Sequence, residues 1–386
     1  MSEAITAARL QDEFPMDPGL AYLNHAAVAP WPRRATDAVM RFAVENSRIG
    51  AARYDQWLSV EDQLRRNLAR LINAPAATDI ALCKNTSEAL SMVAAGLDWR
   101  DGDEIVITSQ EFPSNRIVWE ALEHRGVRLR VANIDHQEVT PEGAIEDSLS
   151  DRTRLVSVSS VQYGTGLKLD IEHIGALCRS HGVLFCVDAI QSVGAEPLDV
   201  QAAGADFAMA DGHKWMLGPE GLAFFYAAPQ VRDQLRLQEF GWHMVADRGN
   251  YERTDWEPAP DAKRFECGSP NLLAAHALEA STHLLLEVGL GQVRERIDQR
   301  MAHLESGLNQ IPGVVPLTPD HPERRLGIYT VTVSGVDNRR LCRELREHNI
   351  ICANRGGGLR FSPHFYTPYA GLEQALDTLE KLVPRR

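Results

Sequence analysis

The stretch that decides the fold reads Val183-Leu-Phe-Cys-Val-Asp-Ala-Ile-Gln191, an apolar run that ends in an aspartate. An uninterrupted apolar run of this length is typical of a strand that is buried on both faces, as in a parallel sheet covered by helices. Asp188 stands at the carboxyl end of that strand, where open α/β sheets bind their ligands. A plain helix cap or loop carboxylate is the alternative, and it is common at such places. Asp188 therefore marks a candidate site that needs a second feature to support it.

The second feature is the stretch Asp211-Gly-His-Lys-Trp-Met-Leu-Gly-Pro-Glu-Gly221, which also follows an apolar run. It places Lys214 directly after His213 and ahead of a glycine-rich turn. Burial and a neighbouring cation lower the pKa of an amine, which suits a lysine that forms a Schiff base. Most lysines lie on the surface instead. The flanking glycines and the nearby Asp188 favour the functional interpretation.

Outward from these two stretches, short apolar runs alternate with helical segments over the first two thirds of the chain. We expect strands at 79–83, 104–108, 129–134, 153–161, 183–187, 207–210 and 222–226. We expect helices at 87–97, 118–124 and 171–181. This alternation predicts an α/β fold with a mostly parallel seven-stranded sheet covered by helices.

A different pattern begins after the Pro-, Asp- and Glu-rich stretch 255–261. A long helical segment, 272–308, is followed by a strand at 328–333, a helix at 339–348, a strand at 350–353 and a helix at 372–382. A chain of 386 residues is also long for one core. We therefore predict an N-terminal arm (1–20), a large domain (21–270) and a smaller C-terminal α+β domain (271–386).

Composition excludes several classes of partner. The net charge of −13 argues against nucleic acid or an anionic membrane surface as the main partner. Residues 1–14 lack the apolar core of a signal peptide, and no stretch approaches the roughly 18 apolar residues of a membrane helix. The six cysteines are scattered, without a CxxC or Cys/His cluster, so we expect no metal site and no disulfide framework. These features predict a cytoplasmic protein with reduced thiols.

Seven motifs in order resemble the class V aminotransferase family of pyridoxal-phosphate (PLP) enzymes. That family includes cysteine desulfurases, isopenicillin N epimerase and kynureninase. The resemblance covers nearly the whole chain and is carried by 22–27, 85–88, 111–115, 188–191, 212–219, 265–271 and 360–364. It implies PLP fold type I and pyridoxal 5'-phosphate as the cofactor.

Five residues carry the central cofactor roles that the resemblance implies. Lys214 is the Schiff-base lysine, and Asp188 keeps the pyridine nitrogen protonated so that the ring acts as an electron sink. Gln191 is expected to hydrogen-bond the phenolic oxygen. Thr86 and Ser87 open a helix after a strand, where free N–H groups and hydroxyls suit a phosphate.

Further cofactor contacts follow from the same resemblance. His213 adds a phosphate donor, Phe112 stacks on the ring, and Gln162 packs near the ring oxygen. Ser269 stands where relatives use threonine to reach the phosphate of the other subunit, which implies a homodimer with shared active sites. Asp211 departs from the pattern, because relatives often have serine there and an ionised aspartate would repel a phosphate.

The substrate end is expected to involve three residues. Arg360 corresponds to the arginine that binds the α-carboxylate of an L-amino-acid substrate, and a guanidinium matches a carboxylate well. Asn24 and His25 are expected to line the substrate pocket. Trp242 and His243 are expected in a lid loop.

The common machinery permits several reactions once an external aldimine has formed and Lys214 removes the Cα proton. Desulfurases also need a nucleophilic cysteine on a loop shortly before the substrate arginine. Here the corresponding stretch is short, and its only thiol, Cys352, lies in a predicted strand. We therefore favour β-elimination at a C–S bond without a persulfide cysteine, as in relatives such as hercynylcysteine sulfoxide lyase.

Four alternatives stay open. Two are an aminotransferase and an isopenicillin N epimerase-like epimerase. A cysteine desulfurase that uses Cys352 is disfavoured by the predicted strand. A non-catalytic PLP-binding protein is disfavoured by the intact set of Lys214, Asp188 and Arg360, because a scaffold has no need of all three.

Overall fold

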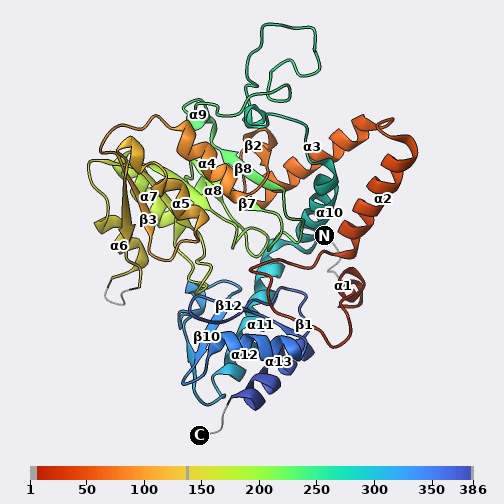
Figure 1. Cartoon of the computed structure of the whole chain (residues 1–386), viewed down its shortest axis with the longest axis vertical. Helices are drawn as coiled ribbons and strands as arrows, with labels where there is room; N and C mark the ends of the chain where they lie inside the picture. Colours follow the sequence, from red (N-terminus) through yellow and green to blue (C-terminus); the bar gives the residue numbers. More distant parts are fainter. Residues whose placement is uncertain (1–6, 136–138, 384–386) are drawn as a thin grey trace.

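The computed structural model describes residues 7–135 and 139–383. Its larger part is built on a seven-stranded sheet (Figure 1). In spatial order the strands are β2 (Ile80–Cys83), β8 (Ala223–Ala227), β7 (Phe207–Asp211), β6 (Leu184–Asp188), β5 (Thr153–Ser159), β3 (Glu104–Thr108) and β4 (Arg128–Ala132). Only β8 runs against its neighbours; the remaining pairs are parallel. The predicted mostly parallel seven-stranded sheet is confirmed.

Helices pack against this sheet because its central strands are apolar on both faces. Every residue of β3, β7 and β8 is buried. Helix α4 (Thr86–Gly96) contacts β7 and β8, and α7 (Ile171–His181) contacts β6. Other helices of this part are α5 (Ser114–Glu120), α6 (Pro141–Asp147), α8 (Val200–Ala203) and α9 (Pro229–Arg232). Because both faces of the sheet are covered, the polar residues at the carboxyl ends of the strands face the crevice beyond those ends.

Two long N-terminal helices follow the short helix α1 (Ala7–Glu13). They are α2 (Arg33–Ile49) and α3 (Tyr54–Leu71), and both pack against α10 (Leu272–Val288). The segment predicted as one helix over 272–308 is two helices, because Gly289 adopts a φ of +85° between α10 and α11 (Leu290–Leu308). The break redirects the chain from the large part toward the small one (Figure 1).

The smaller C-terminal part has its own sheet, as predicted. Its four antiparallel strands are, in spatial order, β12 (Ala353–Arg355), β13 (Gly358–Phe361), β10 (Tyr329–Val333) and β9 (Val314–Pro316). Helices α12 (Asn338–Glu347) and α13 (Tyr369–Leu382) pack beside it, and α13 also contacts α11. The exact domain boundaries stay predictions.

The N-terminal segment ties the two parts together. Strand β1 (Ala21–Tyr22) pairs in parallel with β11 (Ile350–Ile351) of the small part. Just beyond it, Asn24 forms a bridge with Ser362. The chain then enters α2 of the large part, so the crevice between the parts is closed along one side by residues 21–27.

The described residues include no helix that is both long and apolar enough to cross a membrane. Within the same residues there is no group of three or more His, Cys, Asp or Glu side chains that could hold a metal ion.

Candidate active site

A cavity of about 350 Å³ lies where the two parts of the molecule meet. Its walls come from the carboxyl ends of β6 and β7, the first turn of α4, and the β12–β13 hairpin of the small part. This volume lies within the range of about 300–1,000 Å³ typical of small-molecule sites. Eight predicted site residues line the cavity together: Thr86, Ser87, Phe112, Asp188, Gln191, His213, Lys214 and Arg360.

Asp188 and Lys214 are the buried ionisable pair at the floor of this cavity. Burial raises the pKa of the Asp188 carboxyl, the nearby Glu111 raises it further, and the Ile190 N–H and the Lys214 amine oppose the rise. Burial lowers the pKa of the Lys214 amine, and the positive charge of Arg360 lowers it further against the attraction of Asp188. A lysine with a lowered pKa is neutral more often, which is the form that forms a Schiff base.

The first turn of α4 lines the cavity with Thr86 and Ser87, which bring two hydroxyls and the backbone N–H groups of a helix start. The N-cap residue Asn85 accepts from the Glu88 N–H at 2.9 Å, which sets the start of the helix. The hydroxyl of Thr86 accepts from the Asp211 N–H at 3.1 Å, so its own proton is free to be donated. Ser87 Oγ donates to Ser114 Oγ at 2.8 Å. A phosphate is the group that such a helix end suits best.

Asp211 lies beside the imidazole of His213, and both residues line the cavity. Asp211 Oδ1 lies 2.9 Å from His213 Nδ1. The two atoms are close but not aligned for a hydrogen bond, because neither has a hydrogen-bond partner among the described residues. The departure of Asp211 from the serine of its relatives thus places a carboxylate next to the imidazole two residues on.

Phe112 presents an aromatic ring at the cavity. It lies in the loop before α5, is 39% exposed, and meets the Tyr163 ring edge-on at 5.1 Å between centroids. The Lys214 amine lies 5.6 Å from the centre of the Phe112 ring. A ring on that side of the lysine has the position that stacking on a planar cofactor requires.

The two glutamines differ in how they meet the cavity. Gln191 lines it, with Nε2 donating to the Ala26 carbonyl at 3.1 Å and Oε1 accepting from Trp215 Nε1 at 2.9 Å. Gln162 does not line it; its Nε2 donates to Thr108 Oγ1 at 3.2 Å, and its buried Oε1 has no partner among the described residues. The next residue, Tyr163, lines the cavity instead. The contact of Gln162 with the cofactor stays a prediction.

Arg360 is a buried guanidinium that the protein leaves partly unsatisfied. Nη1 donates to the Tyr163 carbonyl at 2.7 Å, whereas Nε is buried and has no hydrogen-bond partner within residues 7–135 and 139–383. Burial lowers the pKa of Arg360 to about 10, and the neighbouring Arg355 adds to that shift. A buried cation without a counter-ion is costly, so the site is built to receive an anion.

Arg355 also lines the cavity and was missed by sequence reasoning. It lies at the end of β12, and the turn at Gly356 and Gly357, both with positive φ, folds the chain back into β13. This turn brings two guanidinium groups to one cavity. Two arginines flanking a glycine run in a predicted hairpin was the signal that could have revealed it.

Besides Gln162, three predicted site residues do not line this cavity. His25 is fully buried behind it, with Nδ1 2.8 Å from the Ser362 carbonyl and Nε2 2.8 Å from the Tyr366 hydroxyl. Burial lowers the pKa of His25 to about 4, so the ring is neutral.

Asn24 has a buried Oδ1 for which the described residues supply no partner. Ser269 lines a different pocket, of about 300 Å³. Their roles stay predictions.

The arrangement fits pyridoxal 5'-phosphate. It offers an amine for a Schiff base, a buried carboxylate for a ring nitrogen, a helix N-terminus for a phosphate and an unsatisfied guanidinium for a substrate carboxylate. A lysine and an aspartate in these roles, on this α/β sheet, define a PLP-dependent enzyme of fold type I. When bound, PLP supplies the electron sink for a negative charge at the substrate Cα.

Comparisons with known proteins identify the family. The family model described as Aminotransferase class-V matches residues 21–365, and the chain belongs to that family. It is 31% identical to a probable cysteine desulfurase from Methanothermobacter thermautotrophicus, with 94% of each chain covered. It is 30% identical to isopenicillin N epimerase from Streptomyces clavuligerus, covering 95% of this chain and 96% of that one.

Solved structures give the same result. The cystine C–S lyase C-DES, solved in complex with its reaction product cysteine persulfide, superposes with a TM-score of 0.89 at 27% identity, covering 96% of this chain and 100% of that one. A cysteine desulfurase from Thermococcus onnurineus NA1 has a TM-score of 0.90 at 24% identity, over 99% of each chain, which supports the fold alone. The protein is therefore a PLP enzyme of the class V aminotransferase family.

The role of Lys214 can be tested directly. Lys214→Ala removes the only amine lining the cavity among the described residues, so we expect no borohydride-reducible chromophore and a loss of turnover by at least about 10²–10⁴-fold. Lys381→Ala, on the exposed side of the last turn of α13, is the matched control and should behave like the unchanged enzyme. Absorbance before and after borohydride reduction is the measurement. A reducible chromophore with normal rates in Lys214→Ala would remove Lys214 from its assigned role.

Proposed function

We propose that the enzyme cleaves the C–S bond of a cysteine-derived L-amino acid by β-elimination, without forming a persulfide on the protein. The observation that carries this proposal is the position of the thiols. None of the six cysteines is among the residues that line the cavity. A desulfurase needs a nucleophilic thiol within reach of the substrate sulfur, whereas a β-eliminating lyase needs only a base and a leaving group.

Cys352 is the thiol closest in sequence to Arg360, and its environment supports a structural role. It stands between β11 and β12, is 1% exposed, and has its sulfur 3.9 Å from that of Cys342 on α12. The hydrogen bond with Cys342 and burial raise the pKa of Cys352 well above that of an ordinary thiol. A sulfur in this place faces the helix, and its thiolate fraction is small.

The side chains that line the cavity have complementary roles in this reaction. With PLP bound, Arg360 would hold the α-carboxylate and Lys214 would take the Cα proton. The C–S bonding electrons then leave with the sulfur-bearing group. Phe112 and Tyr163 place two aromatic rings at the wall of the cavity. Hydrolysis of the remaining fragment gives pyruvate and ammonia.

The second guanidinium suggests the substrate class. Arg355 is exposed at the cavity wall, where it is available to a second anionic group at the far end of a substrate. Cystine has such a group, since it carries a carboxylate on each half. The similarity to a cystine C–S lyase supports the same choice. We therefore propose a disulfide or thioether of cysteine with a distal carboxylate as the substrate.

A panel of amino acids tests the reaction. With L-cystine we expect a spectral change of the bound cofactor, pyruvate and ammonia in equal amounts, and a released sulfur species. Keto acid formed without pyruvate would indicate an aminotransferase. Loss of optical activity without cleavage would indicate an epimerase. Either result would defeat the lyase proposal.

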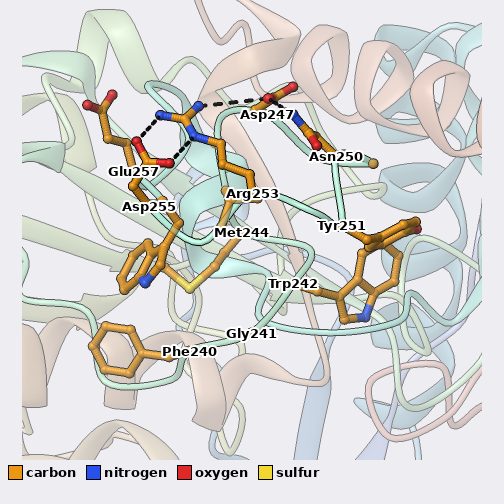
Figure 2. A pocket seen from close by; sticks show the side chains of 13 residues that line it. Phe240, Gly241, Trp242, Met244, Asp247, Asn250, Tyr251, Arg253, Asp255 and Glu257 are labelled. Atoms are coloured by element: carbon orange, nitrogen blue, oxygen red, sulfur yellow. Dashed lines mark hydrogen bonds and ion pairs between the residues drawn. The ribbon is translucent and has the colours of Figure 1, made fainter.

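We further propose that the enzyme works as a homodimer with shared active sites. Ser269 does not face its own chain's cavity. The projecting loop at the top of Figure 1 carries exposed Phe240, Trp242, Tyr251 and Trp256. Figure 2 shows Trp242 and Tyr251 on one side of the loop's pocket and Phe240 on the other. Clustered exposed aromatic side chains are typical of a protein–protein interface.

All six cysteines are free. This supports the proposal that the enzyme works in the reducing environment of the cytoplasm.

Cys352→Ser tests the absence of a persulfide. Because the sulfur faces α12 and not the cavity, we expect the variant to keep most of the activity. Mass spectrometry of the unchanged enzyme during turnover should find no added sulfur on Cys352. Cys178→Ser, which alters a buried thiol on α7, controls for the loss of a buried sulfur. Added sulfur on Cys352 together with an inactive Cys352→Ser would establish a desulfurase instead.

The two arginines should have separable effects on substrate binding. Arg360→Ala should weaken binding of every amino-acid substrate by about 2–5 kcal/mol, because it removes a buried charge partner. Arg355→Ala should weaken only substrates with a distal carboxylate, by up to about 1 kcal/mol, because an exposed pair is screened by solvent. KM values for L-cystine and S-methyl-L-cysteine measure the difference, and Arg355→Lys is the charge-preserving control. Equal losses for both substrates in Arg355→Ala would exclude the second-anion role.

Assembly should depend on the projecting loop. Replacing both Tyr251 and Trp256 by aspartate places charges in the proposed interface, so we expect monomers and a loss of activity together, as the neighbour's Ser269 is withdrawn. Sedimentation at assay concentration, with activity measured on the same samples, is the test. The control is Met40→Asp on α2, which alters another exposed apolar side chain. A fully active monomer would exclude shared sites.

A further inference from the structure

Two cysteines of the small part lie in direct contact. Cys342 on α12 and Cys352, next to β12, have their sulfur atoms 3.9 Å apart, and Cys342 Sγ also lies 3.7 Å from the Cys352 carbonyl. Both are free thiols. A disulfide has a sulfur–sulfur distance of about 2.05 Å. The sulfurs therefore need to approach by only about 2 Å to become bonded.

The two thiols differ in access and in acidity. Cys342 is 8% exposed and Cys352 only 1%, so a small oxidant in water meets Cys342 first. The hydrogen bond from the Cys352 thiol lowers the pKa of Cys342 to about 7, and the guanidinium groups of Arg346, Arg355 and Arg343 add to this. The thiolate is the form that reacts, and Cys352 is in place as its resolving partner.

We propose that Cys342 and Cys352 are a redox modification site, which hydrogen peroxide converts to a reversible intramolecular disulfide. The Cys342 thiolate attacks one peroxide oxygen, the O–O bond breaks, and hydroxide leaves, so that Cys342 becomes a sulfenic acid. The Cys352 sulfur then attacks the Cys342 sulfur and loses its proton, and the hydroxyl leaves as water. In total, two thiols and one peroxide give one disulfide and two waters. A dithiol reductant reverses the change by exchange.

The strand after Cys352 connects this modification to the active-site cavity. Ala353 pairs with Arg360 across the β12–β13 ladder, and Arg355 pairs with Gly358. Drawing Cys352 toward α12 displaces β12, the strand that pairs with β13 at the backbone of Arg360. When a bound substrate is misplaced by about 1 Å, its reaction can slow by up to about a hundredfold. This coupling rests on the proposed role of Arg360 in holding the substrate carboxylate.

The modification itself is tested on the PLP-loaded enzyme without reference to its reaction. Treatment with hydrogen peroxide should lower the protein mass by about 2 Da and reduce the number of free thiols from six to four, and peptide mapping should join residues 342 and 352. Dithiothreitol should restore all six. Cys342→Ser and Cys352→Ser should lose the mass change, whereas Cys178→Ser, whose thiol is buried on α7, should retain it. Oxygen addition at Cys342 without the cross-link would overturn the proposal.

The coupling is tested by a second readout on the same samples. We expect the oxidised enzyme to require about tenfold more amino acid for the same change in cofactor absorbance, with the shift absent in Cys342→Ser. A cross-linked enzyme with unchanged amino-acid binding would refute the coupling while leaving the disulfide in place. Failure of the lyase proposal would leave both the mass change and the thiol count unaffected, so the two proposals fail separately.

Discussion

A charged group that leaves water must find compensation inside the protein, and this constraint governs the centre of the molecule. Lys214, Asp188 and Arg360 are all buried around one cavity. Burial shifts the pKa of each toward its neutral form, upward for the carboxyl and downward for the two cations. The protein compensates them only in part, since Arg360 Nε has no partner among the described residues. Such a site is stabilised by a cofactor and a substrate that bring the missing charges.

The same constraint applies where the two parts of the molecule are joined, because buried polar groups connect them. Arg360 belongs to the small sheet, yet its Nη1 donates to the Tyr163 carbonyl of the large part at 2.7 Å. His25 makes the complementary connection, with both ring nitrogens directed at small-part atoms in a fully buried place. The walls of the cavity are therefore held by buried polar contacts at the junction. These contacts set the distance between the lysine on one part and the arginine on the other.

The sequence predicts the parts of this site that depend on local interactions, and it misses the parts that depend on contacts between distant residues. The apolar run before Asp188 and the glycine-flanked Lys214 predict strand ends, and strand ends of a parallel sheet meet at one edge. By contrast, the inward position of His25 depends on a bridge to Ser362, more than three hundred residues away, that no local pattern reveals. Arg355 lines the cavity because the β12–β13 hairpin turns directly after it. Periodicity alone predicted one helix over 272–308. Gly289 lies inside that pattern, and its positive φ divides the segment into two helices.

Under the proposed function, the β12–β13 hairpin is the element that favours one of the reactions that PLP allows. Gly356 has a φ of +59°, and a Cβ there would collide with the backbone of Gly164, so the turn is pressed against the large part. This confinement supports the proposal that no loop here carries a thiol to the substrate. The same closeness brings Arg355 and Arg360 to the cavity together. Under the proposed function, the constraint that brings two positive charges to the cavity also keeps a sulfur nucleophile away, and the cleaved sulfur leaves with its own fragment rather than passing to the protein.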